Sequence, residues 1–207
     1  MDKQEALNKH FLLIIIAAMG WFALTAQLYL IIIYRTAALA ETLLRYFSFF
    51  TILSNILVAV CATALIINSR HHFFSKSSTI TAITIYITVV GLVYNIILRP
   101  LWKPQGLQKG VDELLHTIIP ALFIIFWILW ASISTLEWKN ILSWLIYPFF
   151  YSIFILARGA FSGYYPYPFM DVNVLGYNKV LVNSAGLVII FLLFSFFTVL
   201  FGKMRKH

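Results

Sequence analysis

The sequence has few charged residues and a single cysteine. Of its 207 residues, 11% are charged and 62% are hydrophobic, whereas an ordinary soluble domain has about 25% charged and about 45–50% apolar residues. So few charges cannot cover the surface of a water-soluble protein, which excludes that class. Cys61 is alone, so an intrachain disulfide is also excluded.

Long apolar runs with almost no charge recur along the whole chain. Each run is long enough for a helix that crosses about 30 Å of hydrocarbon, which takes roughly 20 residues. The run "TITAITIYITVV" is rich in β-branched residues, but an isolated strand could not pair its backbone in lipid. The sequence therefore predicts an all-α polytopic membrane protein, with one six-helix transmembrane bundle and a single domain over residues 1–207. The expected spans are 11–33, 47–67, 79–98, 114–134, 141–158 and 180–202.

The distribution of basic residues gives the expected topology. Six spans place both termini on the same side, and Lys and Arg are almost evenly divided between the two sides. Several arginines on the side opposite the termini lie at helix ends, where they can serve the function of the protein instead of setting its orientation in the membrane. Without them the positive-inside rule places both termini in the cytoplasm. The net charge of +8, with the basic tail 203–207, then indicates anionic lipid and no nucleic acid. If the chain is bacterial, its membrane is the inner membrane.

Polar residues concentrate near one face of the predicted bundle. Even-numbered spans begin, and odd-numbered spans end, on the face opposite the termini, and the polar side chains lie within a few helical turns of those ends. The long connection 159–179 lies on the same face and is expected to cap a pocket. The candidate site residues are Thr51, Asn55, Asn95, Arg99, Asp112, His116, Arg158, Tyr165 and Asn183.

Helical spacing predicts that several of these side chains share a direction. Ser48, Thr51 and Asn55 follow an i, i+3, i+7 pattern, which forms one stripe on a helix. Asn95 and Arg99 are four residues apart, as are Asp112 and His116. Each set can face a single cavity.

The residue types in this set suit acyl transfer. A threonine hydroxyl is a poor nucleophile unless a base takes its proton during attack, and His116 is the base expected for Thr51. We expect Asn55, or the backbone near Ser54, to stabilise an oxyanion and Asp112 to orient His116. Arg99 and Arg158 could hold a substrate carboxylate or extend to lipid headgroups.

No His, Cys, Asp or Glu spacing in the sequence resembles a zinc site. The sequence therefore predicts no metal and no cofactor.

Short motifs in three predicted spans resemble a known family. "FFTILSN", "LLHTIIPALF" and "YPFF" are similar to motifs of the androgen-induced and androgen-dependent TFPI-regulating membrane proteins. "NIILRP", "LARGAFSGYYPYPF" and "LGY" resemble the predicted six-span relatives in bacteria. The resemblance implies hydrolysis of fatty acid esters of hydroxy fatty acids by a threonine nucleophile and a histidine. By motif, these residues are Thr51 and His116.

Two other function classes stay open at this stage. A non-enzymatic protein that binds or transports a lipid or small anion would place polar groups near the bilayer midplane, where Thr25 and Gln27 are the candidates. A receptor or assembly partner without chemistry is the third possibility. The expected partners are membrane lipids and a lipid ester substrate, and the sequence does not determine the oligomeric state.

Overall fold

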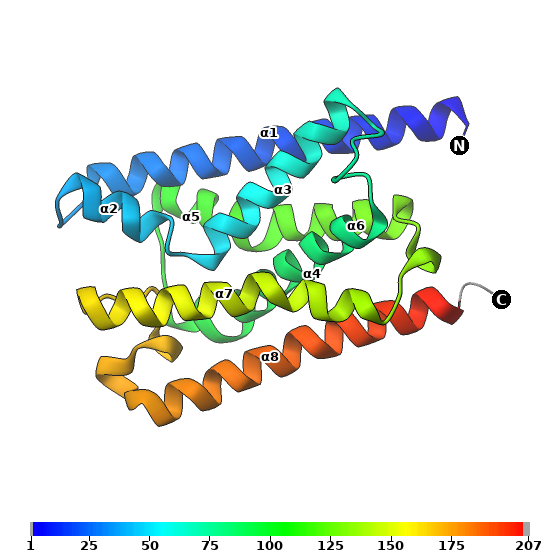
Figure 1. The fold of residues 1–207 in the computed structure, drawn as a ribbon. Coiled ribbons are helices and arrows are strands. Elements are labelled where there is room, and N and C mark those ends of the chain that lie inside the picture. The colour runs from blue at the N-terminus through cyan, green and yellow to red at the C-terminus, as the bar shows by residue number, and fades with distance from the viewer. Residues whose placement is uncertain (1, 205–207) are drawn as a thin grey trace. The chain divides into compact units, whose positions relative to one another are not determined.

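A computed structural model describes residues 2–204 and is all-α, with no strand in that range (Figure 1). The α-helices are α1 (Lys3–Ile33), α2 (Leu39–Tyr46), α3 (Phe50–Ile67), α4 (Ser77–Val93), α5 (Gly106–Glu113), α6 (Ile119–Trp130), α7 (Lys139–Ser162) and α8 (Val172–Met204). Two π-helical turns are η1 (Tyr94–Leu98) and η3 (Leu114–Ile118), and the short 3-10 turns are η2 (Arg99–Leu101), η4 (Ile133–Thr135) and η5 (Pro168–Met170).

Within residues 2–204, six helical segments are long and apolar enough to cross a membrane, as the sequence predicted. They are Lys3–Ile33, Phe50–Ile67, Ser77–Leu101, Gly106–Trp130, Lys139–Ser162 and Val172–Met204. The chain is therefore an integral membrane protein with the predicted all-α polytopic fold.

Most spans are longer than predicted, because the helices continue past the apolar runs. α1 begins at Lys3, where the Asp2 carboxylate caps the helix by accepting a hydrogen bond from the Glu5 N–H. The fourth span begins at Gly106 with the amphipathic α5. Much of the predicted connection 159–179 is helical, since α7 ends at Ser162 and α8 begins at Val172. Residues 205–207 of the basic tail lie outside the described residues.

A separate short helix, α2, precedes the second span and corrects one predicted stripe. α3 begins at Phe50, so Ser48 lies in the bend before α3 and donates a hydrogen bond to the Leu44 carbonyl at 2.5 Å. The prediction that Ser48 shares a helical stripe with Thr51 and Asn55 is wrong, because the second span starts three residues later than expected.

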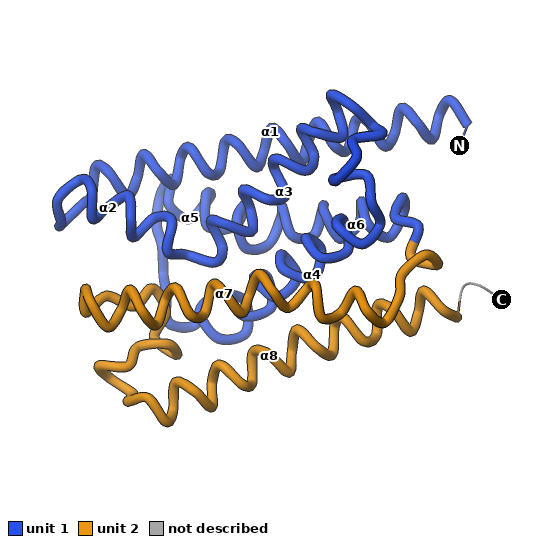
Figure 2. Tube along the Cα trace, viewed as in Figure 1, with its two compact units in different colours: residues 1–132 blue, residues 133–207 orange. Residues whose placement is uncertain are grey.

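The chain forms two compact units, residues 1–132 and 133–207 (Figure 2). The prediction of a single domain stays a prediction. In the first unit, α1 packs against α3 and α6, and α4 packs against the same two helices (Figure 1).

Small residues and buried hydrogen bonds hold the first unit together. A Cβ on Gly20 would lie 3.0 Å from the Ala59 Cβ, so α1 and α3 approach closely there. The Trp127 indole N–H donates to the Thr81 hydroxyl at 2.9 Å and joins α6 to α4. Close packing and polar links of this kind are what stabilise helix pairs in lipid, where no hydrophobic effect drives association.

In the second unit α7 packs along α8, and α8 also packs against η4 and η5. α7 ends at Ser162 and is capped by Gly163, whose φ of 69° places it in the left-handed conformation. The backbone of α8 kinks at Gly176, where φ is 74°. The turn before α8 folds back on α7, because the Tyr165 ring lies directly on Gly159 and occupies the space of a Cβ there.

Candidate functional site

The candidate site in the first unit is built on the two π-helical turns. η1 continues α4, and η3 joins α5 to α6, and the two turns contact each other. A π-turn inserts one residue into a helix, which changes the direction of the side chains before it and weakens the backbone pairing, and such turns occur frequently at functional sites. Tyr94 and Asn95 lie in η1, and His116 lies in η3.

The His116 ring is held in one tautomer. Its Nδ1 lies 2.9 Å from the Asp112 carbonyl oxygen and 3.3 Å from the Asp112 Oδ1. Both neighbours are hydrogen-bond acceptors, so Nδ1 carries the proton of the neutral ring and Nε2 has the lone pair. Nε2 makes no hydrogen bond within residues 2–204, and the ring is partly accessible, with 14% of its side-chain surface exposed. The Nε2 lone pair of His116 is therefore available to accept a hydrogen bond.

Asp112 connects His116 to Tyr94. Asp112 is 5% exposed, and its Oδ2 accepts a hydrogen bond from the Tyr94 hydroxyl. The Tyr94 ring also stacks on the His116 ring, with centroids 3.9 Å apart and an angle of 15° between the planes. The three side chains fix one another, so the predicted pairing of Asp112 with His116 is present in the structure.

Asn55 links the helix that carries Thr51 to the turn that carries His116. Asn55 is fully buried, and its Nδ2 donates to the Thr51 carbonyl at 2.9 Å and to the Leu115 carbonyl at 3.1 Å. Both amide hydrogens are therefore used, and none is left for an oxyanion. Asn55 holds the site together instead of serving as the expected oxyanion donor.

Asn95 in η1 and Arg99 in η2 add further hydrogen bonds to η3 and to the end of α5. The Asn95 Nδ2 donates to the Gly91 carbonyl at 2.8 Å and to the His116 carbonyl at 3.3 Å. The Arg99 Nη2 lies 2.7 Å from the Glu113 Oε2 and 3.1 Å from the Thr117 Oγ1. Because Glu113 already neutralises Arg99, a substrate carboxylate would have to displace it.

Thr51 lies in the first turn of α3 and is 7% exposed. The Asn55 side-chain amide donates both to the Thr51 carbonyl and to the Leu115 carbonyl. It therefore bridges the backbone of Thr51 to the residue that precedes His116. The structure thus brings together the predicted residues of the first unit, which come from α3, η1, η2, α5 and η3.

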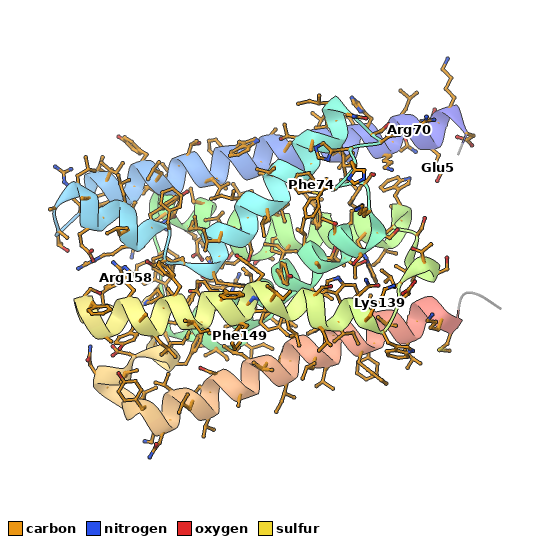
Figure 3. The ribbon with its side chains drawn as sticks, in the orientation of Figure 1. Glu5, Arg70, Phe74, Lys139, Phe149 and Arg158 are labelled. Atoms are coloured by element: carbon orange, nitrogen blue, oxygen red, sulfur yellow. The ribbon has the colours of Figure 1, made fainter. Side chains whose placement is uncertain are left out.

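The other three predicted residues lie in the second unit, and each has a local role there. Arg158, near the end of α7 (Figure 3), donates to the Tyr164 carbonyl at 3.5 Å and lies 5.0 Å from the Tyr164 ring centre. The Asn183 Nδ2 donates to the Phe169 carbonyl at 2.8 Å. Burial, with smaller contributions from Tyr177 and Asp171, raises the pKa of the Tyr165 phenol, so Tyr165 stays protonated at neutral pH.

Three residues of the site were missed by sequence reasoning, namely Tyr94, Glu113 and Thr117. Tyr94 lies one residue before Asn95, and a tyrosine in an apolar run gives no sign of its partner. Glu113 gave a usable signal, because it is an acidic residue four positions before Thr117 and next to Asp112 at the start of a predicted span.

Within residues 2–204, no three His, Cys, Asp or Glu side chains come close enough together to hold a metal ion. Comparisons with protein-family models, with curated proteins and with solved structures return no match. The chemistry of the site must therefore be inferred from its geometry.

Proposed function

We propose that this protein is an intramembrane hydrolase of lipid esters, with Thr51 as the nucleophile and His116 as the general base. The observation that carries the proposal is the His116 ring, whose Nδ1 is bound to Asp112 while Nε2 has no partner in the described residues. A base that is oriented by a carboxylate and stacked in place is the arrangement that activates a hydroxyl nucleophile.

The proposed reaction has two steps. In the first, the Thr51 Oγ1 attacks the ester carbonyl carbon, His116 Nε2 takes the hydroxyl proton, and that proton passes to the departing alkoxide as the ester bond breaks. In the second, water attacks the acyl-threonine while His116 takes a proton from the water. That proton returns to Thr51 as the carboxylic acid is released, and the enzyme is regenerated.

The proposed substrate is a fatty acid ester of a hydroxy fatty acid, in line with the motif resemblance. Such a molecule enters from the bilayer, so the partners of the protein are membrane lipids. In this proposal its free carboxylate is held near the interface by Arg99, which requires release of Glu113. Both termini are proposed to be cytoplasmic, with the inner membrane as the location if the chain is bacterial.

Purified protein in detergent, treated with a fluorophosphonate probe and with a hydroxy fatty acid ester, tests the proposal. The wild type should be labelled on Thr51, as located by mass spectrometry, and should cleave the ester. Thr51→Ala and His116→Ala should both lose labelling and cleavage while staying folded.

Two matched controls separate chemistry from folding. Thr84 is a buried threonine of α4 that donates to the Ile80 carbonyl at 2.9 Å, and Thr84→Ala should keep full labelling. His71 lies in the connection between α3 and α4, and His71→Ala should also stay active. Ester that binds without cleavage, together with absent labelling, would favour the alternative of a lipid or small-anion binding protein.

A further inference from the structure

The carbonyl groups of Leu115 and His116 receive their hydrogen bonds from side chains of other helices. Asn55 on α3 donates to Leu115, and Asn95 in η1 donates to His116. In a regular helix, each carbonyl would accept from the N–H four residues later. Two successive helical carbonyls that accept from side chains therefore need an explanation in the local sequence.

Pro120 supplies that cause. Proline has no N–H, so the His116 carbonyl has no donor four residues later. The Ile119 N–H bonds to the Leu114 carbonyl in the π-register, which removes the usual donor of Leu115. The next possible donor for Leu115, five residues later, is again at Pro120. The proline therefore removes the donor four residues after His116 and the donor five residues after Leu115.

The same relation occurs at the other π-turn. η1 spans Tyr94–Leu98 and ends two residues before Pro100, and η3 spans Leu114–Ile118 and ends two residues before Pro120. The Arg99 N–H bonds to the Tyr94 carbonyl, just as Ile119 bonds to Leu114. Repetition of the pattern on two helices supports the proline as the origin of the π-turn.

We propose that Pro120 is a positioning residue for His116. By withholding its N–H it leaves the Leu115 and His116 carbonyls to Asn55 and Asn95, and these bonds tie the turn that carries His116 to α3 and to η1. The catalytic role of His116 in this proposal rests on the proposed function. The hydrogen bonds from Asn55 and Asn95 to the Leu115 and His116 carbonyls do not depend on it.

A double-mutant cycle on the melting temperature tests the tie without any activity. Pro120→Ala provides one N–H, which in the π-register of Ile119 would donate to the Leu115 carbonyl, so the Asn55 donor is no longer needed there. Asn55→Leu should therefore lower the melting temperature more in the wild type than in the Pro120→Ala protein, by roughly 2–4 °C. The buried Asn55 Oδ1, which has no donor in the described residues, is lost in both backgrounds and cancels in the cycle.

Pro148 is the matched control, since it is also inside a spanning helix. In the Pro148→Ala background, Asn55→Leu should have its full wild-type effect. Equal effects of Asn55→Leu in the wild type and in Pro120→Ala would overturn the proposal.

A second variant keeps the proposal testable if Pro120→Ala does not fold. Asn55→Asp keeps the size of the side chain and loses both amide hydrogens, so it should melt below Asn55→Leu, which removes the buried oxygen as well. An Asn55→Asp protein as stable as the wild type would contradict the donor role of Asn55.

Probe labelling adds the link to His116. Asn95→Leu should lower the maximal labelling rate at least about tenfold, with little change in the probe concentration that gives half the rate. A wild type that is not labelled at all would reject the proposed function, while the melting-temperature cycle would still decide the role of Pro120.

Discussion

Gly91 of α4 lies against the turn that carries His116, and Gly91→Ala perturbs that contact. A Cβ on Gly91 would be 3.2 Å from the His116 carbonyl oxygen and 3.5 Å from the Pro120 Cβ. Neither neighbour is the flexible end of a side chain. One is backbone and the other is a proline ring, so α4 and η3 must separate by a few tenths of an ångström.

The expected magnitude follows from two opposing effects. Overpacking in a well-packed interior costs about 1–3 kcal/mol, and replacing glycine by alanine inside a helix stabilises by about 0.5–1 kcal/mol. The net expectation is a loss of about 1 kcal/mol, which is a decrease of roughly 2–4 °C in the melting temperature for a chain of this size. The bond between Asn95 and the His116 carbonyl is already 3.3 Å long and should be lost first, so probe labelling should fall as well.

Thermal unfolding in detergent measures this effect, with Gly110→Ala as the control. Gly110 lies in α5 of the same unit, and nothing lies within 4 Å of the position that a Cβ would occupy there, so its substitution should raise the melting temperature. A Gly91→Ala protein that is stabilised as much as Gly110→Ala would refute the close approach of α4 and η3.

Three further outcomes are expected. Asp112→Asn should lower the labelling rate at least about tenfold with an unchanged probe concentration at half rate, because the group that orients His116 is altered; an unchanged rate would show that Asp112 is not needed. Arg99→Met should change the melting temperature little, since its pair with Glu113 is exposed to solvent and screened, and an unchanged KM for a carboxylate-bearing ester would exclude Arg99 as its anchor. Burial raises the pKa of Tyr46 to about 12, above about 10 for an unfolded tyrosine, so stability should be full below pH 10 and fall towards pH 12, and Tyr46→Phe should flatten that fall in pH-dependent melting.

The membrane class and the six spans could be predicted from the sequence because both depend on long-range apolar content. The boundaries were less accessible. α5 is amphipathic and adds eight residues, Gly106–Glu113, before the predicted start of the fourth span. The predicted start of the second span is three residues too early, because the aromatic residues before Phe50 are as apolar as the helix itself.

The site was predictable in its titratable residues and not in its connections. The i, i+4 spacing of Asp112 and His116 is a local property and predicts their contact. The roles of Tyr94 and Glu113 depend on how η1 lies against η3, and a π-turn has no clear sequence signature apart from the nearby proline. The sequence indicates that Asn55 belongs to the site but suggests the wrong chemistry for it, because its partners include a backbone carbonyl 60 residues away.

The position of fluorophosphonate on the labelled protein tests the central claim most directly. The account predicts a single adduct on the Thr51 Oγ1 in the wild type, absent in Thr51→Ala and in His116→Ala, and retained in Thr84→Ala. An adduct on another residue, or one that persists in Thr51→Ala, would contradict it.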